Sequence, residues 1–336
     1  MKDHVITVGP AHRRHATPRV LALGGGKGGS GRTLLAANLA IYLAQMGKKV
    51  VVIDASIGAA NLHTLLALEC PPVGVSDFLS GRVTQVDDVL RPVPGITGGS
   101  LQMIAGVPAM TAVPSKREAK LRLLERLRGM DFDFIMLDLD SGATPETLDF
   151  FLAADVRVAV VAPELTAIER HWQFLEAAIY RDAFGPGVSA DDAAWSRRAF
   201  DLGQREGGFL PPPTDLVDEV GQHDPAAAAW LRRRFGRLKS YVLVNQARTT
   251  SDSRLLEGLR SVSRRRFGVS VEALGPVDFD DSAWLSVRRR RPLVLEYPES
   301  PATRVIGAIA RRIVIATSAQ ASAAAADNVV PIGAAR

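Results

Sequence analysis

A glycine-rich stretch near the N-terminus is the part of this sequence best suited to bind and act on a ligand. It reads Gly26-Lys27-Gly28-Gly29-Ser30-Gly31-Arg32-Thr33. Glycines let backbone N–H groups approach a ligand closely, and successive N–H groups at a helix start form a nest for phosphate oxygens. The spacing matches the phosphate-binding pattern G-x-x-x-x-G-K-S/T, with Arg32 at the lysine position. We therefore expect these eight residues to bind a phosphorylated ligand.

The segments on either side of this stretch fit that role. Residues 19–23 form a short apolar run typical of a buried strand, and residues 33–46 indicate a helix that ends at Gly47. A strand, a glycine-rich turn and a helix are the context that the pattern requires, and Thr33 is then placed to bind magnesium. Arg32 keeps the positive charge of a lysine, but its guanidinium is longer, planar and forked, so it does not reproduce a point charge.

Two further apolar runs end in a carboxylate. Residues 48–54 end at Asp54, and residues 134–138 end at Asp138. Buried parallel strands deliver such groups to the carboxyl edge of a sheet, where α/β proteins bind their ligands. We expect both carboxylates near the glycine-rich stretch.

Lys27, directly before two glycines, resembles the KGGxGKS/T signature of the MinD/ParA family of dimerising ATPases. The resemblance implies that Lys27 is a catalytic residue that reaches the partner's nucleotide across a dimer interface. It also implies an α/β fold, with a doubly wound, mostly parallel sheet and helices on both faces. ATP or ADP with Mg²⁺ would be the bound ligand.

The segment after the second strand resembles the family's D-x-D-x-G-x-x-N-L motif. Asp54, Gly58, Asn61 and Leu62 match it, which makes Asp54 a second catalytic candidate. The family's water-positioning aspartate falls on Ser56, and a serine cannot act as an anionic partner to that water. Together with Arg32, this replacement predicts weak or absent hydrolysis with nucleotide binding retained or weakened.

Other family roles fall on three residues. Asp138 resembles the Walker B aspartate, which with Thr33 would hold the magnesium. Asn245 ends an apolar run, where the family reads the adenine edge, and an amide offers both a donor and an acceptor for this. Asn245 as a plain turn former is the alternative.

Residues 163–170 resemble a segment found in MinD and in the flagellar-number regulator FlhG, so the FlhG-like branch is the nearest relative. This branch implies a homodimer that positions a cellular assembly, such as a motility or polar apparatus. We expect a cytoplasmic protein, with a peripheral place at a membrane or pole as an option. The single cysteine, Cys70, agrees with a reducing compartment and disfavours an iron–sulfur relative.

The chain of 336 residues permits one large α/β domain. We expect a flexible leader at 1–18, a P-loop ATPase domain at 19–316 and a flexible tail at 317–336. Residues 184–236 interrupt the α/β rhythm and indicate a helical excursion inserted in the same domain, with a separate unit as the alternative.

Two other functions are compatible with the sequence. One is a scaffold that no longer needs nucleotide. The other is a ParA-like binder of DNA through Arg288–Arg291 and Arg264–Arg266, although such runs are more often a solvated surface; anionic lipid is a further ligand for Arg288–Arg291.

Overall fold

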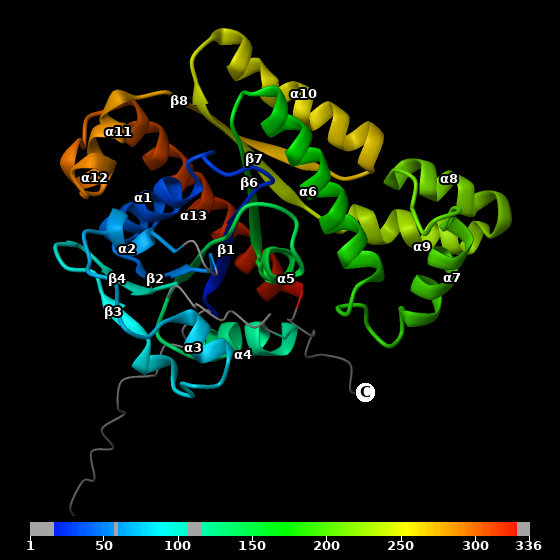
Figure 1. Ribbon diagram of the computed structural model, residues 1–336, viewed down its shortest axis with the longest axis horizontal. Coiled ribbons are helices and arrows are strands. Elements are labelled where there is room, and N and C mark those ends of the chain that lie inside the picture. Colours follow the sequence, from blue (N-terminus) through cyan, green and yellow to red (C-terminus); the bar gives the residue numbers. More distant parts are fainter. Residues whose placement is uncertain (1–16, 57–59, 107–115, 328–336) are drawn as a thin grey trace, which may run out of the picture.

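The computed structural model describes residues 17–56, 60–106 and 116–327, and within them the strands form one eight-stranded sheet (Figure 1). The strands are β1 (Arg19–Gly24), β2 (Lys49–Asp54), β3 (Leu90–Pro92), β4 (Ser100–Ile104), β5 (Phe134–Asp138), β6 (Val156–Val161), β7 (Ser240–Ala247) and β8 (Val271–Asp278). Their order is β3-β4-β2-β5-β1-β6-β7-β8. Only the β3–β4 pair of this sheet is antiparallel. The predicted mostly parallel α/β sheet is confirmed.

Helices cover both faces of this sheet. One face packs against α1 (Arg32–Gln45), α2 (Leu62–Leu65), α11 (Asp281–Arg288), α12 (Leu293–Glu296) and α13 (Pro301–Asp327). The other packs against α3 (Val75–Leu79), the 3-10 helix Val86–Asp88, α4 (Arg117–Arg128), α5 (Pro145–Ala153), α6 (Leu165–Phe184), α7 (Ala193–Gly203), α8 (Pro213–His223), α9 (Pro225–Gly236) and α10 (Thr250–Phe267). The sheet therefore lies between two hydrophobic cores.

Strand β1 shows why these strands read as continuous apolar runs. Leu21 and Leu23 belong to the core under α1, whereas Val20 and Ala22 belong to the core on the opposite face. Successive strand side chains point to opposite faces, so a strand covered on both faces needs apolar residues at every position.

Helices α7, α8 and α9 occupy the segment predicted to be an insertion, and Figure 1 shows them grouped beyond the ends of α6 and α10. Ala199, Leu216 and Leu231 from these helices are fully buried in the core that also holds α6. The Asp224 carboxylate starts α9 by accepting hydrogen bonds from the N–H groups of Ala226 and Ala227 at 3.0 and 3.1 Å. The three helices thus share the core of the sheet.

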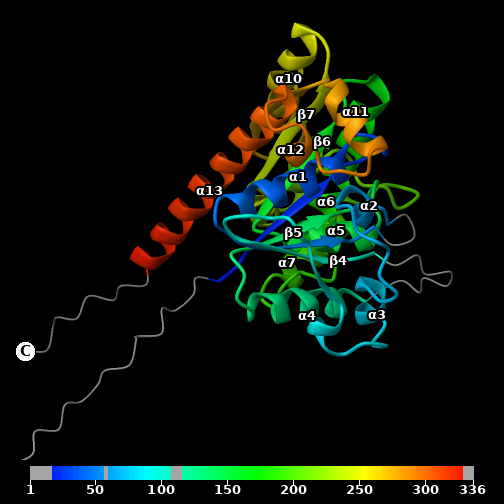
Figure 2. The same cartoon turned by 90° about the vertical axis from the view of Figure 1, so that its left-hand side faces the viewer.

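The C-terminal helix is longer than the sequence suggested. Helix α13 continues to Asp327, past the expected start of a tail at residue 317, and Figure 2 shows it projecting from the body. The added part is rich in alanine, the strongest helix former. Most of the predicted leader (1–16) and the end of the predicted tail (328–336) lie outside the described residues. Across the described residues, no helix is both long and apolar enough to cross a membrane.

Candidate nucleotide-binding site

The glycine-rich stretch forms the turn between β1 and α1, and its glycines are required by close packing. Gly31 starts α1 with φ of 82°, a left-handed conformation that favours glycine. A Cβ on Gly31 would lie 2.3 Å from Nδ2 of Asn245, and a Cβ on Gly26 would lie 2.0 Å from the carbonyl oxygen of Arg170 in α6. The loop is therefore held between β7 and α6, with no room for side chains at these positions.

Arg32 turns its guanidinium into the interior of this loop. Its Nη1 donates to the carbonyl oxygens of Lys27 at 2.7 Å and Gly25 at 3.4 Å, and to Oγ of Ser30 at 3.1 Å. The side chain is buried, and Nε has no hydrogen-bond partner among the described residues. Burial lowers the pKa of Arg32, although the carboxylates of Asp138 and Asp140 oppose the change. One end of the guanidinium thus braces the loop from inside.

Lys27 is held by the start of helix α6. Its ammonium group pairs with the Glu164 carboxylate and donates to Oγ1 of Thr166 at 3.1 Å. The side chains of Lys27 and Glu164 are 37% and 58% exposed, and ion pairs this exposed contribute little free energy. The lysine is therefore bound within its own chain by a contact that is easily exchanged.

Asp54 and Asp138 are neighbours in the register of β2 and β5, and both are fully buried. Asp54 accepts three backbone hydrogen bonds, from Ser56 at 3.1 Å and from Asn61 and Leu62 at 3.0 Å each. Burial raises the pKa of Asp54 to about 6, against the effect of these bonds. Asp54 thus fixes the segment that follows β2; its catalytic role stays a prediction, and Gly58 lies outside the described residues.

Asp138 is the most unusual group of the site. Neither carboxylate oxygen has a hydrogen-bond partner of normal geometry among the described residues. Burial and then the charge of Asp54 raise the pKa of Asp138 to about 8, while the Thr33 hydroxyl and Arg32 oppose the rise.

Unpaired acceptor oxygens next to the Thr33 hydroxyl fit a hydrated magnesium ion, which prefers oxygen ligands and keeps much of its water. In the described part of the chain, no cluster of three His, Cys, Asp or Glu side chains could hold a metal by itself. Asp138 and Thr33 would therefore hold magnesium together with water and the phosphates of a nucleotide.

A cavity of about 220 Å³ adjoins the loop, and we call it the base cavity because base recognition is predicted for Asn245 in its lining. It lies between the ends of β7 and β8 and the start of α13, and its lining includes Asn245, Gln246 and Trp284. Nδ2 of Asn245 donates to the carbonyl oxygen of Ser30 at 2.8 Å, and Nε2 of Gln246 donates to that of Gly29 at 3.0 Å. The Asn245 amide nitrogen thus braces the loop, and base recognition by Asn245 stays a prediction.

Three contacts of this site were not predicted from the sequence. Gln246, with φ of 62°, reaches the loop. Glu164 lies in the segment 163–170, which resembles MinD and FlhG, and the local sequence gives no sign of its ion pair with Lys27. Trp284, which is 55% exposed, lines the base cavity.

The arginine run beside the cavity is partly engaged within the chain. The guanidinium of Arg288 lies 4.8 Å from the ring centre of Trp284. Arg289 and Arg291 pair with the Glu296 carboxylate at 2.9 and 3.4 Å. These contacts reduce the charge available to DNA or lipid.

The fold and the loop define a P-loop nucleotide-binding protein. Residues 21–293 match the family model described as the CobQ/CobB/MinD/ParA nucleotide binding domain, and the chain belongs to this family.

Comparisons with individual proteins agree. The chain is 25% identical over 296 residues to the antiactivator FleN of Pseudomonas aeruginosa, covering 88% of this chain and 86% of FleN. It is 36% identical over 151 residues to an ATP-binding protein of Methanocaldococcus jannaschii, covering 44% of this chain and 54% of that protein. It is 32% identical over 152 residues to the septum site-determining protein MinD of Escherichia coli, covering 45% of this chain and 55% of that MinD. The chain thus spans about half the length of these last two.

Solved structures show the same fold. MinD of Pyrococcus horikoshii, complexed with Mg-ADP, superposes with a TM-score of 0.59 at 17% identity, covering 88% of this chain and 96% of that one. A ParA family ATPase of Chlorobium tepidum gives a TM-score of 0.57 at 15% identity, covering 88% and 99%.

Proposed function

We propose that this chain is an adenine-nucleotide switch of the FlhG-like branch, which forms a homodimer around ATP and Mg²⁺ and hydrolyses ATP weakly or not at all. Its regulatory output would be the placement or control of a cellular assembly. The family membership and the likeness to FleN along 88% of the chain support this proposal.

The observation that carries the proposal is the position of the Arg32 guanidinium inside an otherwise intact loop. Nη1 of Arg32 is bonded to three oxygens of the loop itself. Phosphoryl transfer depends on charges placed to stabilise the transition state. A guanidinium anchored in this way keeps the loop in shape for phosphate binding, but its planar fork does not place charge as a lysine ammonium would.

Ser56 supports the same conclusion. It follows Asp54 by two residues, where the resemblance expects an aspartate that orients the attacking water. A neutral hydroxyl cannot stabilise the positive charge that such a water gains when it attacks. The chain therefore keeps binding groups and lacks two groups used in turnover.

Lys27 would act in dimerisation. In the single chain its ammonium group is held by Glu164 and Thr166, both exposed at the rim of the site. In the proposed dimer, Lys27 would exchange these partners for a phosphate bound to the second protomer. The exposed ion pair offers little resistance to this exchange.

Calorimetry of ATP and ADP binding with Mg²⁺, together with phosphate release, tests the proposal. The proteins are the wild type, Arg32→Lys, Ser56→Asp and the double variant, with Arg264→Lys as a control because Arg264 is exposed on α10. We expect the wild type to bind nucleotide with little turnover and the double variant to gain turnover at least about tenfold.

Two outcomes would contradict the proposal. Robust phosphate release by the wild type that is lost in Asp138→Ala would show that Arg32 and Ser56 support catalysis. Failure of the wild type to bind any adenine nucleotide would favour the second candidate, a nucleotide-independent scaffold. The observation that fits such a scaffold is the burial of Asp138 beside Asp54, because burial raises the pKa of Asp138 and a protonated carboxyl binds magnesium poorly.

A further inference from the structure

A two-walled groove lies between the inserted helices and the C-terminal half of α10. It consists of two adjoining hollows of about 500 Å³ each. Thr214 of α8 and Arg265 of α10 line both hollows, so the two are continuous. We call this feature the α8–α10 groove.

The walls of the groove are fixed before any partner binds. Oγ1 of Thr214 donates to the carbonyl oxygen of Arg266 at 2.9 Å, which ties the start of α8 to the end of α10. Phe267 at the end of α10 is fully buried and stacks on Trp172 of α6, with ring centres 5.5 Å apart. A groove held open in this way requires little ordering when a ligand binds, which favours affinity.

The rim of the groove is cationic. Arg265 and Arg266 line the groove and are exposed, and neither forms an ion pair within the described residues, although burial raises the pKa of the Glu176 carboxyl and the charge of Arg266 opposes this rise. Arg232 of α9 also lines the groove, and its guanidinium is 3.8 Å from the Asp218 carboxylate, a loose and exposed pair. The guanidinium groups of Arg265 and Arg266 can therefore form bidentate hydrogen bonds with carboxylates of a ligand.

The floor of the groove contains apolar side chains, of which Val262 is partly exposed and Val217 and Phe235 are 5% and 3% exposed. Val262 lines one hollow, and Val217 and Phe235 line the other. The Asp215 and Asp218 carboxylates also line the groove and repel any anion placed beside them, so a ligand must set its negative charges at the arginines and away from these two groups. Separate acidic side chains of a peptide can be spaced in this way, whereas a continuous chain of phosphates cannot. An apolar floor beneath arginines therefore matches a peptide with apolar and acidic side chains better than it matches nucleic acid.

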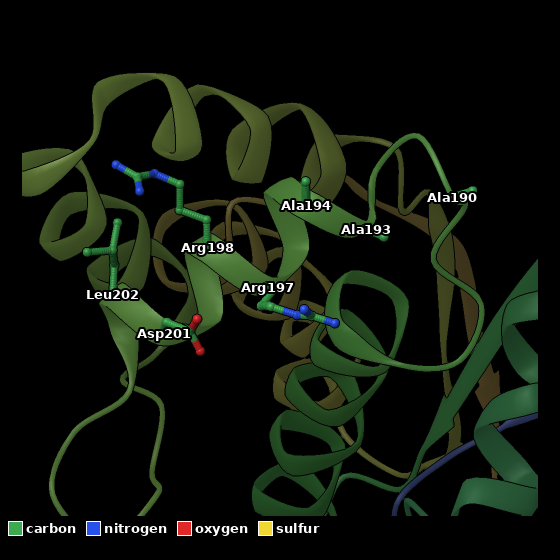
Figure 3. Close-up of a pocket in the computed structure, with 7 residues that line it drawn as sticks. All are labelled: Ala190, Ala193, Ala194, Arg197, Arg198, Asp201 and Leu202. Carbon is green, nitrogen blue, oxygen red and sulfur yellow. The ribbon is translucent and has the colours of Figure 1, made fainter.

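Another hollow, on the surface of the inserted helices, lacks the two walls of the α8–α10 groove. It has a volume of about 590 Å³ and is lined only by α7 and the turn before it. Figure 3 shows that its two arginines, Arg197 and Arg198, point in different directions. Arg198 is also paired with Asp224. That hollow has one wall, and one of its two arginines is already paired, so it carries no comparable site.

We propose that the α8–α10 groove binds an acidic, amphipathic segment of a partner protein. Apolar side chains of the segment would contact Val217, Val262 and Phe235, and its carboxylates would pair with Arg265 and Arg266. The groove lies at the far end of α10, a helix of 18 residues whose start follows Gln246 at the nucleotide site. This is roughly 27 Å along the helix, so the proposal does not depend on nucleotide binding.

Selection of short random peptides on the immobilised full chain tests the proposal. A selected peptide is then synthesised, labelled and titrated by fluorescence anisotropy. We expect selected peptides to combine Asp or Glu with Leu, Ile or Phe. Their affinity should fall at least about tenfold in Arg265→Glu/Arg266→Glu and change less than about twofold in a control, Arg122→Glu/Arg126→Glu, which reverses two exposed arginines of α4.

Further variants separate the groove from general charge and from misfolding. Arg265→Lys/Arg266→Lys should recover part of the affinity, and Val262→Ala should weaken the peptide without a charge change. Circular dichroism and thermal unfolding must show that each variant is folded. The proposal is overturned if no peptide is enriched, if selected peptides lack acids, or if groove and control variants weaken binding equally. A different ligand would also overturn the proposal. This is the case if single-stranded oligothymidylate binds and its affinity depends on Arg265 and Arg266, while no acidic peptide binds.

Discussion

Replacing Asp138 by asparagine should stabilise the nucleotide-free chain by an amount that grows with pH. The Asp138 side chain is fully buried at the end of β5, next to Asp54, and neither of its oxygens has a hydrogen-bond partner of normal geometry among the described residues. A charge in this position costs free energy, whereas asparagine has nearly the shape of the neutral acid and carries no charge.

The size of the effect follows from the pKa of Asp138, which burial and Asp54 raise from 3.8 to about 8. The folded chain therefore holds a proton that the unfolded chain releases. The stability of the wild type is complete below pH 3.8 and falls as pH rises toward 8. The free energy of unfolding of the wild type falls by about 1.4 kcal/mol per pH unit in this range. The stability advantage of Asp138→Asn over the wild type should therefore grow by roughly 4 kcal/mol between about pH 5 and about pH 8.

Urea unfolding followed by circular dichroism measures this difference. Both proteins are unfolded at several pH values with a chelator and without nucleotide, so that no cation is bound to Asp138. Asp201→Asn serves as a matched control because Asp201 is an exposed carboxylate on α7. Its difference from the wild type should stay within about 0.5 kcal/mol across the range.

A difference between Asp138→Asn and the wild type that stays constant with pH would refute this reasoning. It would mean that Asp138 ionises at its ordinary pKa in the folded chain, and that water or a rearranged Thr33 or Arg32 satisfies its oxygens. A loss of stability in the variant at high pH would refute it more strongly, because it would assign the carboxylate a stabilising partner.

Three further predictions concern other groups. His171 is fully buried, neither of its ring nitrogens has a partner among the described residues, and burial lowers its pKa from 6.5 to about 4. The wild type should therefore lose roughly 3 kcal/mol as pH falls through this range, and urea unfolding of His171→Phe should show a smaller loss. Glu164→Ala should raise the fraction of dimer formed with ATP and Mg²⁺ in light scattering, whereas Lys27→Ala should abolish it; equal dimerisation of both variants would contradict the proposed role of Lys27. Nucleotide binding should change the fluorescence of Trp284 at the base cavity, and this signal should disappear in Trp284→Phe.

The local elements of the site could be predicted from the sequence because each depends on residues close together in the chain. Glycines before a helix produce the phosphate-binding turn, and an apolar run that ends in Asp54 or Asp138 indicates a buried strand with a carboxylate at its edge. The fold class followed from the resemblance of these motifs to the MinD/ParA family and was confirmed by the sheet.

Tertiary structure decided what these groups contact. Strand order places β5 between β1 and β2, so Asp138 meets Asp54 and both are desolvated, and no local pattern gives the resulting pKa. The length of a side chain does not tell which oxygens it reaches, so the bonds of Arg32 to its own loop emerged only in the folded chain.

The α8–α10 groove could not be predicted from local sequence patterns for the same reason. The sequence showed the basic run 264–266 and a helical insertion, but the two are separated along the chain and meet only through the packing of α8 on α10. Reading the chain in order is enough to tell which chemical groups this protein carries and on which elements they lie. Burial and partners depend on contacts between distant segments, and these arise only when the helices pack on the sheet.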